Sequence, residues 1–276
     1  MENMSLSNTR EEEGLRPKRS LGQNFLMHPQ IAERICDAAE LSINDTVLEI
    51  GPGTGMLTHV LLARVKKIIA IEADDALIEK LNETFTHEIE EGKLVLIAGD
   101  VREFDSATLT EPYKIVANIP YYITGEIIRS FLSSNNKPSS MTLLVQKEVA
   151  ERIARIKKES LLSLSVKAYG TPQYCFKVPR GAFRPAPNVD SAVLHIKDIS
   201  GSAFPSPDQE ILFFNVLHAG FAHKRKQLGN NLEEVFSPER VADALDAAHI
   251  SRTARAEDLR LESWRAIASA LGRSTD

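Results

Sequence analysis

Apolar and polar positions follow two alternating patterns along the first two thirds of the chain. Short runs of β-branched and aliphatic residues, each ending in a turn, predict strands. These runs cover residues 46–50, 67–71, 93–98, 114–117 and 141–146. Apolar residues three or four positions apart predict helices between them, at residues 29–39, 56–67, 76–90 and 125–132. This regular alternation predicts an α/β fold, a parallel sheet with helices on both faces.

The pattern changes in the remainder of the chain. Lysine and arginine interleave with glutamate over residues 147–160, which is typical of a solvated helix with salt bridges. The periodicity of residues 161–169 fits a helix and a strand equally well. Two further strands, at residues 173–178 and 192–197, are expected to form an antiparallel edge.

A segment rich in Gly, Ser and Pro, residues 201–208, predicts a domain boundary. Beyond it the pattern is helical, over residues 211–221, 230–236, 238–248 and 258–271. We therefore expect a large α/β domain over residues 1–200 and a small all-α C-terminal domain over residues 201–276.

The first predicted strand ends in a glycine-rich turn, Glu49-Ile-Gly-Pro-Gly-Thr-Gly55. Its glycines let a ligand approach bare backbone amides at the start of the following helix. The dinucleotide fingerprint G-x-G-x-x-G/A needs a third small residue, and Met56 stands in that place. The turn therefore argues against a nicotinamide dinucleotide, while a tight turn without any ligand remains the alternative.

Polar residues follow the other predicted parallel strands where each one ends. Glu72 lies 21 residues after Gly51, an interval that suits an acid accepting hydrogen bonds from ribose hydroxyls. Asp100 follows the next strand, where the adenine of a bound nucleoside would lie, and Asn118 follows the one after. Ligands of parallel sheets bind beyond the carboxyl ends of the strands. Together these residues predict a nucleoside site, although each acid alone is equally well a solvated strand end.

Composition restricts the class of protein. The chain has 276 residues, 43% hydrophobic and 26% charged, which is ordinary for a soluble globular protein. No apolar run is long enough for a membrane span, and the acidic N-terminus does not resemble a secretory signal. Cys36 and Cys175 form no C-x-x-C pair and the histidines show no ligand spacing, so we expect a cytoplasmic protein without a metal.

The formal net charge of −5 means that any RNA binding depends on local basic patches. Two short segments could supply such patches, a basic arm near the N-terminus and a basic turn after the first C-terminal helix. Their residues are Arg16, Lys18 and Arg19, and Lys224, Arg225 and Lys226. The second group lies in the predicted helical domain, residues 201–276, which we therefore expect to be the RNA-binding domain. A solvated turn is the alternative for this group.

Five motifs in this order resemble those of the ribosomal RNA adenine dimethyltransferases. They are Gly-Gln-Asn-Phe-Leu at residues 22–26, the glycine-rich turn, Asn-Ile-Pro-Tyr at 118–121, Phe-Arg-Pro-Ala-Pro-Asn-Val-Asp-Ser at 183–191 and Phe-Ala-His-Lys-Arg-Lys-Gln-Leu at 221–228. The resemblance covers roughly residues 16–270. It implies a Rossmann-like class I methyltransferase sheet and S-adenosylmethionine as the methyl donor.

The resemblance also implies the cofactor-binding residues. Asn24 and Leu26 would close over the methionine end of S-adenosylmethionine, and Gly51 would lie under it. Glu72 would bind the ribose, Asp100 the adenine amino group, and Asn118 the region near the sulfonium. These positions are Asn24, Leu26, Gly51, Glu72, Asp100 and Asn118, and none departs from the family pattern.

The expected catalytic residues are Asn118, Ile119, Pro120, Tyr121 and Phe183. The Asn118 side-chain oxygen and the Ile119 carbonyl would accept hydrogen bonds from the target amino group, and Pro120 would fix the direction of that carbonyl. Tyr121 and Phe183 would stack on the unstacked adenine. Alternatively, Tyr122 is the stacking ring and Phe183 belongs to the core.

Within the family, the Pro-Asn-Val-Asp-Ser and Lys-Arg-Lys-Gln-Leu segments favour the members that dimethylate two adjacent adenosines near the 3′ end of 16S rRNA. The expected partner is then 16S rRNA in a 30S ribosomal precursor, bound by a monomer. The related members that act on one adenosine of 23S rRNA are the alternative. A ribosome assembly factor with secondary methylation is another, and a nucleotide-dependent oxidoreductase is disfavoured by Met56.

Overall fold

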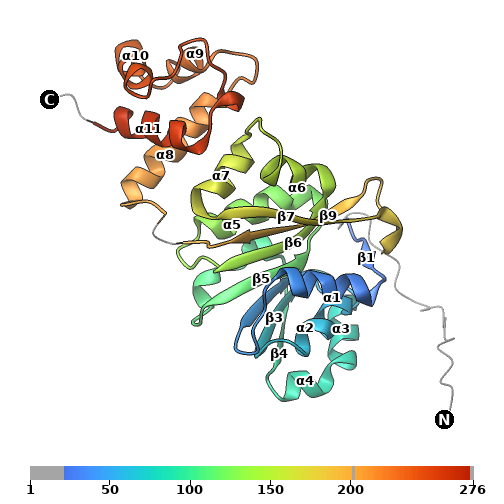
Figure 1. The fold of residues 1–276 in the computed structure, drawn as a ribbon. Coiled ribbons are helices and arrows are strands. Elements are labelled where there is room, and N and C mark those ends of the chain that lie inside the picture. The colour runs from blue at the N-terminus through green and yellow to red at the C-terminus, as the bar shows by residue number, and fades with distance from the viewer. Residues whose placement is uncertain (1–21, 201–202, 274–276) are drawn as a thin grey trace.

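A seven-stranded sheet forms the centre of the molecule (Figure 1). The computed structural model describes residues 22–200 and 203–273. The strand order is β4-β3-β2-β5-β6-β9-β7. The strands are β2 (Thr46–Ile50), β3 (Lys67–Glu72), β4 (Leu94–Ala98), β5 (Tyr113–Asn118), β6 (Ser140–Gln146), β7 (Thr171–Val178) and β9 (Ser191–Lys197). The first five in the spatial order are parallel, as the alternation predicts. The predicted antiparallel edge is confirmed, and β9 lies between β6 and β7.

The central strands are apolar throughout because both faces of the sheet are covered. Val47 belongs to the hydrophobic core on one face, and its neighbour Leu48 belongs to the core on the other. The same alternation separates Leu143 from Leu144 in β6. Side chains of successive strand residues point to opposite faces, so a strand without a solvated face has no polar alternation.

Helices cover both faces of the sheet. Residues of α1 (Pro29–Ala38), α2 (Met56–Leu62) and α3 (Asp75–Thr84) contribute to one core. Those of α5 (Thr124–Ser133), α6 (Lys147–Ala154) and α7 (Leu161–Tyr169) contribute to the other. Residues 161–169, whose periodicity fits a helix and a strand equally well, form the helix α7. A capping box between Ser160 and Ser163 starts this helix. The charged helix α6 carries the expected i,i+4 pairs, Lys147 with Glu151 and Arg152 with Glu148.

Two of the helices predicted between the parallel strands have the wrong extent. The helix expected at residues 56–67 ends at Leu62, because the chain must turn to begin β3 at Lys67. The helix expected at residues 76–90 is broken at Phe85, where the backbone leaves the helical region, and α4 (Thr86–Glu90) follows. The break lets the Phe85 ring pack so closely on Gly55 that an added Cβ would lie 2.6 Å from it.

The C-terminal helices gather beside α7 (Figure 1). They are α8 (Pro207–Gly220), α9 (Leu228–Leu232), α10 (Pro238–Ala247) and α11 (Leu261–Leu271). Trp264 is fully buried among them, against Gly220. None of the helices described is both long and apolar enough to cross a membrane.

An aromatic cluster joins these helices to the sheet part of the molecule. The Tyr169 ring stacks on Phe214 at a centroid distance of 5.7 Å and meets Phe204 edge-on at 5.5 Å. Its hydroxyl donates to the Glu210 carboxylate, and Arg265 donates to the Ala168 carbonyl at 3.1 Å. Because one hydrophobic core continues from the sheet into α8 and α11, the division at residue 200 stays a prediction.

Candidate active site

A cavity opens at the carboxyl ends of the parallel strands, where the sequence predicts a nucleoside site. The turn after β2 forms its floor. Gly51, Gly53 and Gly55 all have positive φ, between 60° and 84°, a region that side chains disfavour. An added Cβ on Gly53 would lie 3.0 Å from the Phe25 ring. Two separate constraints, backbone conformation and space, therefore require glycine here.

Glu72 ties the end of β3 to this turn. One carboxylate oxygen accepts from the Gly53 amide at 3.1 Å, and the other accepts from the amides of Ala73 at 2.9 Å and Asp74 at 3.0 Å. Burial raises the pKa of this carboxyl, and the backbone amides oppose the rise. Since each oxygen can accept more than one hydrogen bond, Glu72 can hold the turn and still accept from ligand hydroxyls.

Asp100 lines the same cavity at the end of β4. Its carboxylate caps the short helical turn Val101–Glu103 and accepts from the Arg102 side chain, with both oxygens 3.0 Å from Nε. This guanidinium holds the pKa of Asp100 below its usual range. The carboxylate is therefore ionised at neutral pH and accepts hydrogen bonds only.

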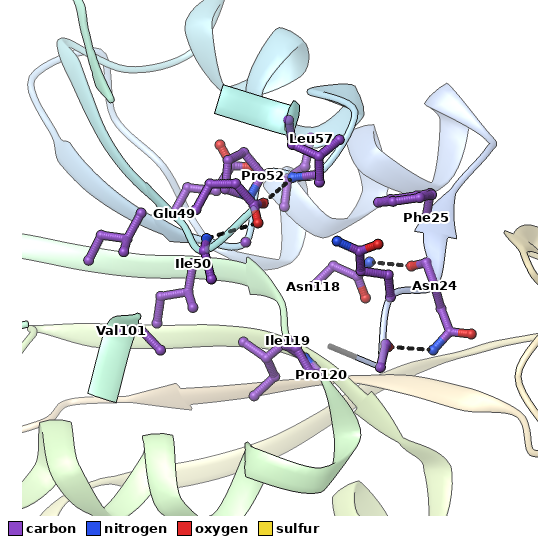
Figure 2. Close-up of a pocket in the computed structure, with 18 of the residues that line it drawn as sticks. Asn24, Phe25, Glu49, Ile50, Pro52, Leu57, Val101, Asn118, Ile119 and Pro120 are labelled. Carbon is purple, nitrogen blue, oxygen red and sulfur yellow. Dashed lines mark hydrogen bonds between the residues drawn. The ribbon is translucent and has the colours of Figure 1, made fainter. Parts of the chain in front are cut away.

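Asn118 ends β5 at the middle of the cavity, and its side-chain orientation is fixed. The amide nitrogen donates to the Asn24 carbonyl at 3.0 Å (Figure 2). Because the Asn118 side-chain nitrogen makes this hydrogen bond, the side-chain oxygen is the atom that remains to accept from a ligand. Ile119 and Pro120 follow along the cavity wall, as the Asn-Ile-Pro-Tyr motif predicts.

A short segment, residues 22–26, crosses the cavity and carries Asn24 and Leu26; we call it the strap. Strand β1 (Phe25–Leu26) pairs antiparallel with β8 (Phe183–Arg184), and the Met27 amide donates to the Ala182 carbonyl at 2.9 Å. The Asn24 side chain donates to the Gly22 carbonyl at 3.0 Å, which bends the strap (Figure 2). Asn24 and Leu26 both line the cavity, as expected.

The aromatic residues differ in their access to the cavity. Tyr121 and Tyr122 both line it, and Tyr122 is 60% exposed. Phe183 does not line it: the residue is 4% exposed and belongs to the core beneath β1. The structure therefore does not bring Phe183 to the cavity; its side chain packs in the hydrophobic core that its β1 partner Leu26 also joins. This position matches the alternative in which Phe183 is a core residue.

Glu49 is a cavity residue to which the sequence assigned no role. It is 1% exposed, and one carboxyl oxygen accepts from the Thr58 hydroxyl at 2.8 Å. Within the described residues the other oxygen has no hydrogen-bond partner. Burial raises the pKa of Glu49 to about 8. An acid inside an otherwise apolar strand is the sequence signal that could have identified it.

The basic turn lies between α8 and α9. Asn231 shapes it, with its side-chain nitrogen donating to the carbonyls of Gly220 at 2.7 Å and His223 at 3.2 Å. Lys224, Arg225 and Lys226 are all exposed, and Lys226 also pairs with Glu234 at 2.5 Å. The other predicted basic group, Arg16, Lys18 and Arg19, lies outside the described residues. Within residues 22–200 and 203–273, no three His, Cys, Asp or Glu side chains are grouped as metal ligands.

Two solved structures share the fold. One is the 23S rRNA methyltransferase ErmE, with a TM-score of 0.73 and 25% identity over 91% of this chain and all of that one. The other is a dimethyladenosine transferase from Plasmodium falciparum, with a TM-score of 0.73 and 27% identity over 88% of this chain and 95% of that one. Together with the cavity at the strand ends, they define this protein as a methyltransferase of class I.

The family follows from the sequence comparisons. The family described as "Ribosomal RNA adenine dimethylase" matches residues 14–272. Proteins named "Ribosomal RNA small subunit methyltransferase A" are similar over most of the chain. The one from Dehalococcoides mccartyi is 39% identical over 92% of this chain and 88% of its own length, and that from Lactococcus lactis is 39% identical over 92% and 90%. This chain belongs to the ribosomal RNA adenine dimethylase family.

Proposed function

We propose that this protein transfers methyl groups from S-adenosylmethionine to the exocyclic amino groups of two adjacent adenosines near the 3′ end of 16S rRNA, in a precursor of the 30S subunit. The family membership and the names of the relatives support the reaction and the substrate. The observation that carries the proposal is the fixed Asn118 amide, whose oxygen remains to accept from an amino group in the cavity.

The cavity fits the proposed cofactor. Gly51 and Gly53 present backbone without side chains, and the carboxylates of Glu72 and Asp100 are acceptors for hydroxyl and amino groups. The unpartnered oxygen of Glu49 suits a ligand that carries positive charge. S-adenosylmethionine, when bound, supplies a methyl group on a sulfonium, which is already activated for in-line displacement. In this proposal Asn24 and Leu26 cover the methionine end, Gly51 lies beneath it, Glu72 binds the ribose, and Asp100 binds the adenine amino group.

The protein would act mainly on the acceptor. The amino group of adenine is planar because its lone pair is delocalised into the ring. Hydrogen bonds to the Asn118 side-chain oxygen and the Ile119 carbonyl would favour a more tetrahedral, more nucleophilic nitrogen. Pro120 restricts the turn and so fixes the direction of that carbonyl. The amine can release its proton after transfer, so positioning and electrostatics supply the acceleration.

A target adenosine in structured RNA must leave its stack to reach this site. An aromatic ring that replaces the lost stacking contributes about 1–3 kcal/mol. Tyr121 follows the two proposed acceptors directly in the chain, and the exposed Tyr122 ring adds a second face at the cavity. We assign the stacking role to Tyr121, with Tyr122 as the alternative.

Mapping of modified adenosines tests this function. The protein is incubated with S-adenosylmethionine and unmethylated 30S or 50S particles, and dimethyladenosine is located by primer extension and mass spectrometry. We expect two adjacent dimethyladenosines in 16S rRNA, and none with Asn118→Ala, which should still bind the cofactor. Modification of 23S rRNA instead would support the alternative substrate. Tight particle binding without methyl transfer would favour an assembly factor and overturn the proposal.

A further inference from the structure

Tyr121 is held at both ends of its side chain. Its backbone begins the short helical turn Tyr121–Ile123, directly after Pro120. Its hydroxyl shares a hydrogen bond of 2.5 Å with the Ser191 hydroxyl. Burial raises the pKa of Tyr121, so the phenol stays protonated at neutral pH. A tyrosine ring usually rotates about two side-chain torsions, and an anchor at the hydroxyl restricts both.

Ser191 is a rigid anchor for that ring. It is the first residue of β9 and has no exposed surface. Its backbone pairs with Gln146 of β6 on one side and with Val178 of β7 on the other. Because strands pair with β9 on both of its sides, Ser191 keeps its position when the cavity wall moves. Its hydroxyl is therefore a fixed attachment point for the Tyr121 ring.

The residue before it, Asp190, holds the chain that leads into β9. The Asp190 carbonyl accepts from the Lys147 amide at 3.0 Å. One carboxylate oxygen accepts from the Arg180 amide at 3.0 Å, and the other lies 2.8 Å from the Lys177 ammonium. Asp190 and Ser191, the last two residues of the motif at 183–191, therefore have different structural roles. Asp190 fixes the backbone, and Ser191 transmits that fixed position to Tyr121.

We propose that Ser191 is a positioning residue for methyl transfer, whose hydroxyl holds the Tyr121 ring in the orientation that stacks the target adenine. This inference rests on the proposed function, in which Tyr121 contacts the base. Ser191 itself lies outside the residues that line the cavity, so it acts through Tyr121 alone. Small displacements of a positioning group reduce turnover strongly, because the reacting atoms lose their alignment.

A double-mutant cycle tests the coupling. Ser191→Ala and Tyr121→Phe remove the same hydrogen bond from its two ends, and each should lower kcat by roughly tenfold. The double variant should be no slower than either single one, since the shared bond is lost only once. Cofactor affinity should stay unchanged and KM for the RNA should change little. The matched control is Ser165→Ala, which should leave kcat unchanged. The buried Ser165 hydroxyl donates to the Leu161 carbonyl of its own helix at 2.7 Å, away from the cavity.

Unchanged kcat in Ser191→Ala would overturn the proposal, and so would effects that multiply in the double variant. Ser191→Thr keeps the hydroxyl and should restore most of the turnover. A general loss of structure would lower cofactor affinity and thermal stability together with kcat, which the cofactor titration detects.

A second measurement separates this inference from the proposed function. The protein is labelled with 3-fluorotyrosine, and the fluorine resonance of Tyr121 is assigned by its loss in Tyr121→Phe. Among the five tyrosines of the chain, this resonance should shift and broaden in Ser191→Ala and stay unchanged in Ser165→Ala. An unaltered Tyr121 resonance in Ser191→Ala would overturn the anchoring. Wild-type protein that anchors Tyr121 but methylates no rRNA would instead overturn the proposed function.

Discussion

Glu49 brings a carboxyl group into the centre of the sheet, where only its protonated form is tolerated without a compensating charge. Its pKa is about 8 in the folded protein and 4.5 in its ordinary state. The folded state therefore holds a proton that the unfolded state releases as pH rises above about 4.5. The contribution of Glu49 to the free energy of unfolding is therefore largest below about pH 4.5, falls as pH rises towards 8, and is constant beyond.

Glu49→Gln should remove this pH dependence. Glutamine keeps the shape of the protonated acid and an acceptor for Thr58, but it cannot ionise. We expect it to raise the free energy of unfolding by about 1–4 kcal/mol at about pH 8.5 and by less than about 1 kcal/mol at about pH 5. Urea unfolding at both pH values measures the difference, with the exposed Glu83→Gln as control. An equal effect at both pH values would contradict the assigned ionisation.

Glu72 connects the turn and the proposed ribose site, so its removal should weaken cofactor binding. Each charge-assisted hydrogen bond contributes about 1.5–3 kcal/mol, and loss of a pair should reduce affinity at least about tenfold. Glu72→Ala also leaves the amides of Gly53, Ala73 and Asp74 without their acceptor. Calorimetric titration with S-adenosylmethionine checks this, and Glu83→Ala should bind normally. Unchanged affinity in Glu72→Ala would remove Glu72 from the site.

At the scale of elements, local patterns predict the sheet well and the strap poorly. The five parallel strands and the residues at their carboxyl ends follow from apolar runs, because strands buried on both faces leave a strong signal. Strands β1 and β8 are two residues each, and they pair across a separation of more than 150 positions. No local pattern encodes such a contact, and the position of Phe183 depends on it.

The strap gives Phe183 a testable structural role. Phe183→Ala would leave a cavity beneath β1, and it should lower the free energy of unfolding by about 3–5 kcal/mol. Because β1 carries Asn24 and Leu26 over the cavity, cofactor affinity should fall as well. Phe183→Leu fills most of the volume and should retain cofactor binding and methyl transfer.

A stacking role would give the opposite result. Leucine offers no aromatic face, so Phe183→Leu would then lose methyl transfer while both variants bound the cofactor normally. Phe131→Leu is the matched control, since Phe131 is 3% exposed in α5 on the other face of the sheet. Phe131→Leu should lower the free energy of unfolding by about as much as Phe183→Leu does, and it should leave the cofactor affinity unchanged. Calorimetry and methyl-transfer assays on the same three variants decide between the two roles.

At the scale of the whole molecule, the arrangement of charge matters more than its total. The chain is acidic, with a formal net charge of −5, yet the basic turn after α8 presents Lys224 and Arg225 to solvent. The Tyr169 cluster and the contact between Lys158 and Glu257 hold the C-terminal helices against the sheet part. An RNA bound at the turn would therefore be held in a fixed position relative to the cavity.

Neutralising the basic turn tests whether it contacts phosphates. Each phosphate contact contributes about 0.7–0.9 to the slope of log affinity against log salt, so replacing Lys224, Arg225 and Lys226 with glutamine should lower that slope by about two to three. The lower value is favoured because Glu234 already partly neutralises Lys226.

The control replaces Lys66, Lys67 and Lys93, which surround the amino ends of β3 and β4 at the edge opposite the cavity. It removes the same charge and should leave the slope nearly unchanged. If both triple variants lower the slope equally, the effect comes from net charge alone. If the variant of the basic turn leaves the slope unaltered, the turn is a solvated loop that does not contact the RNA.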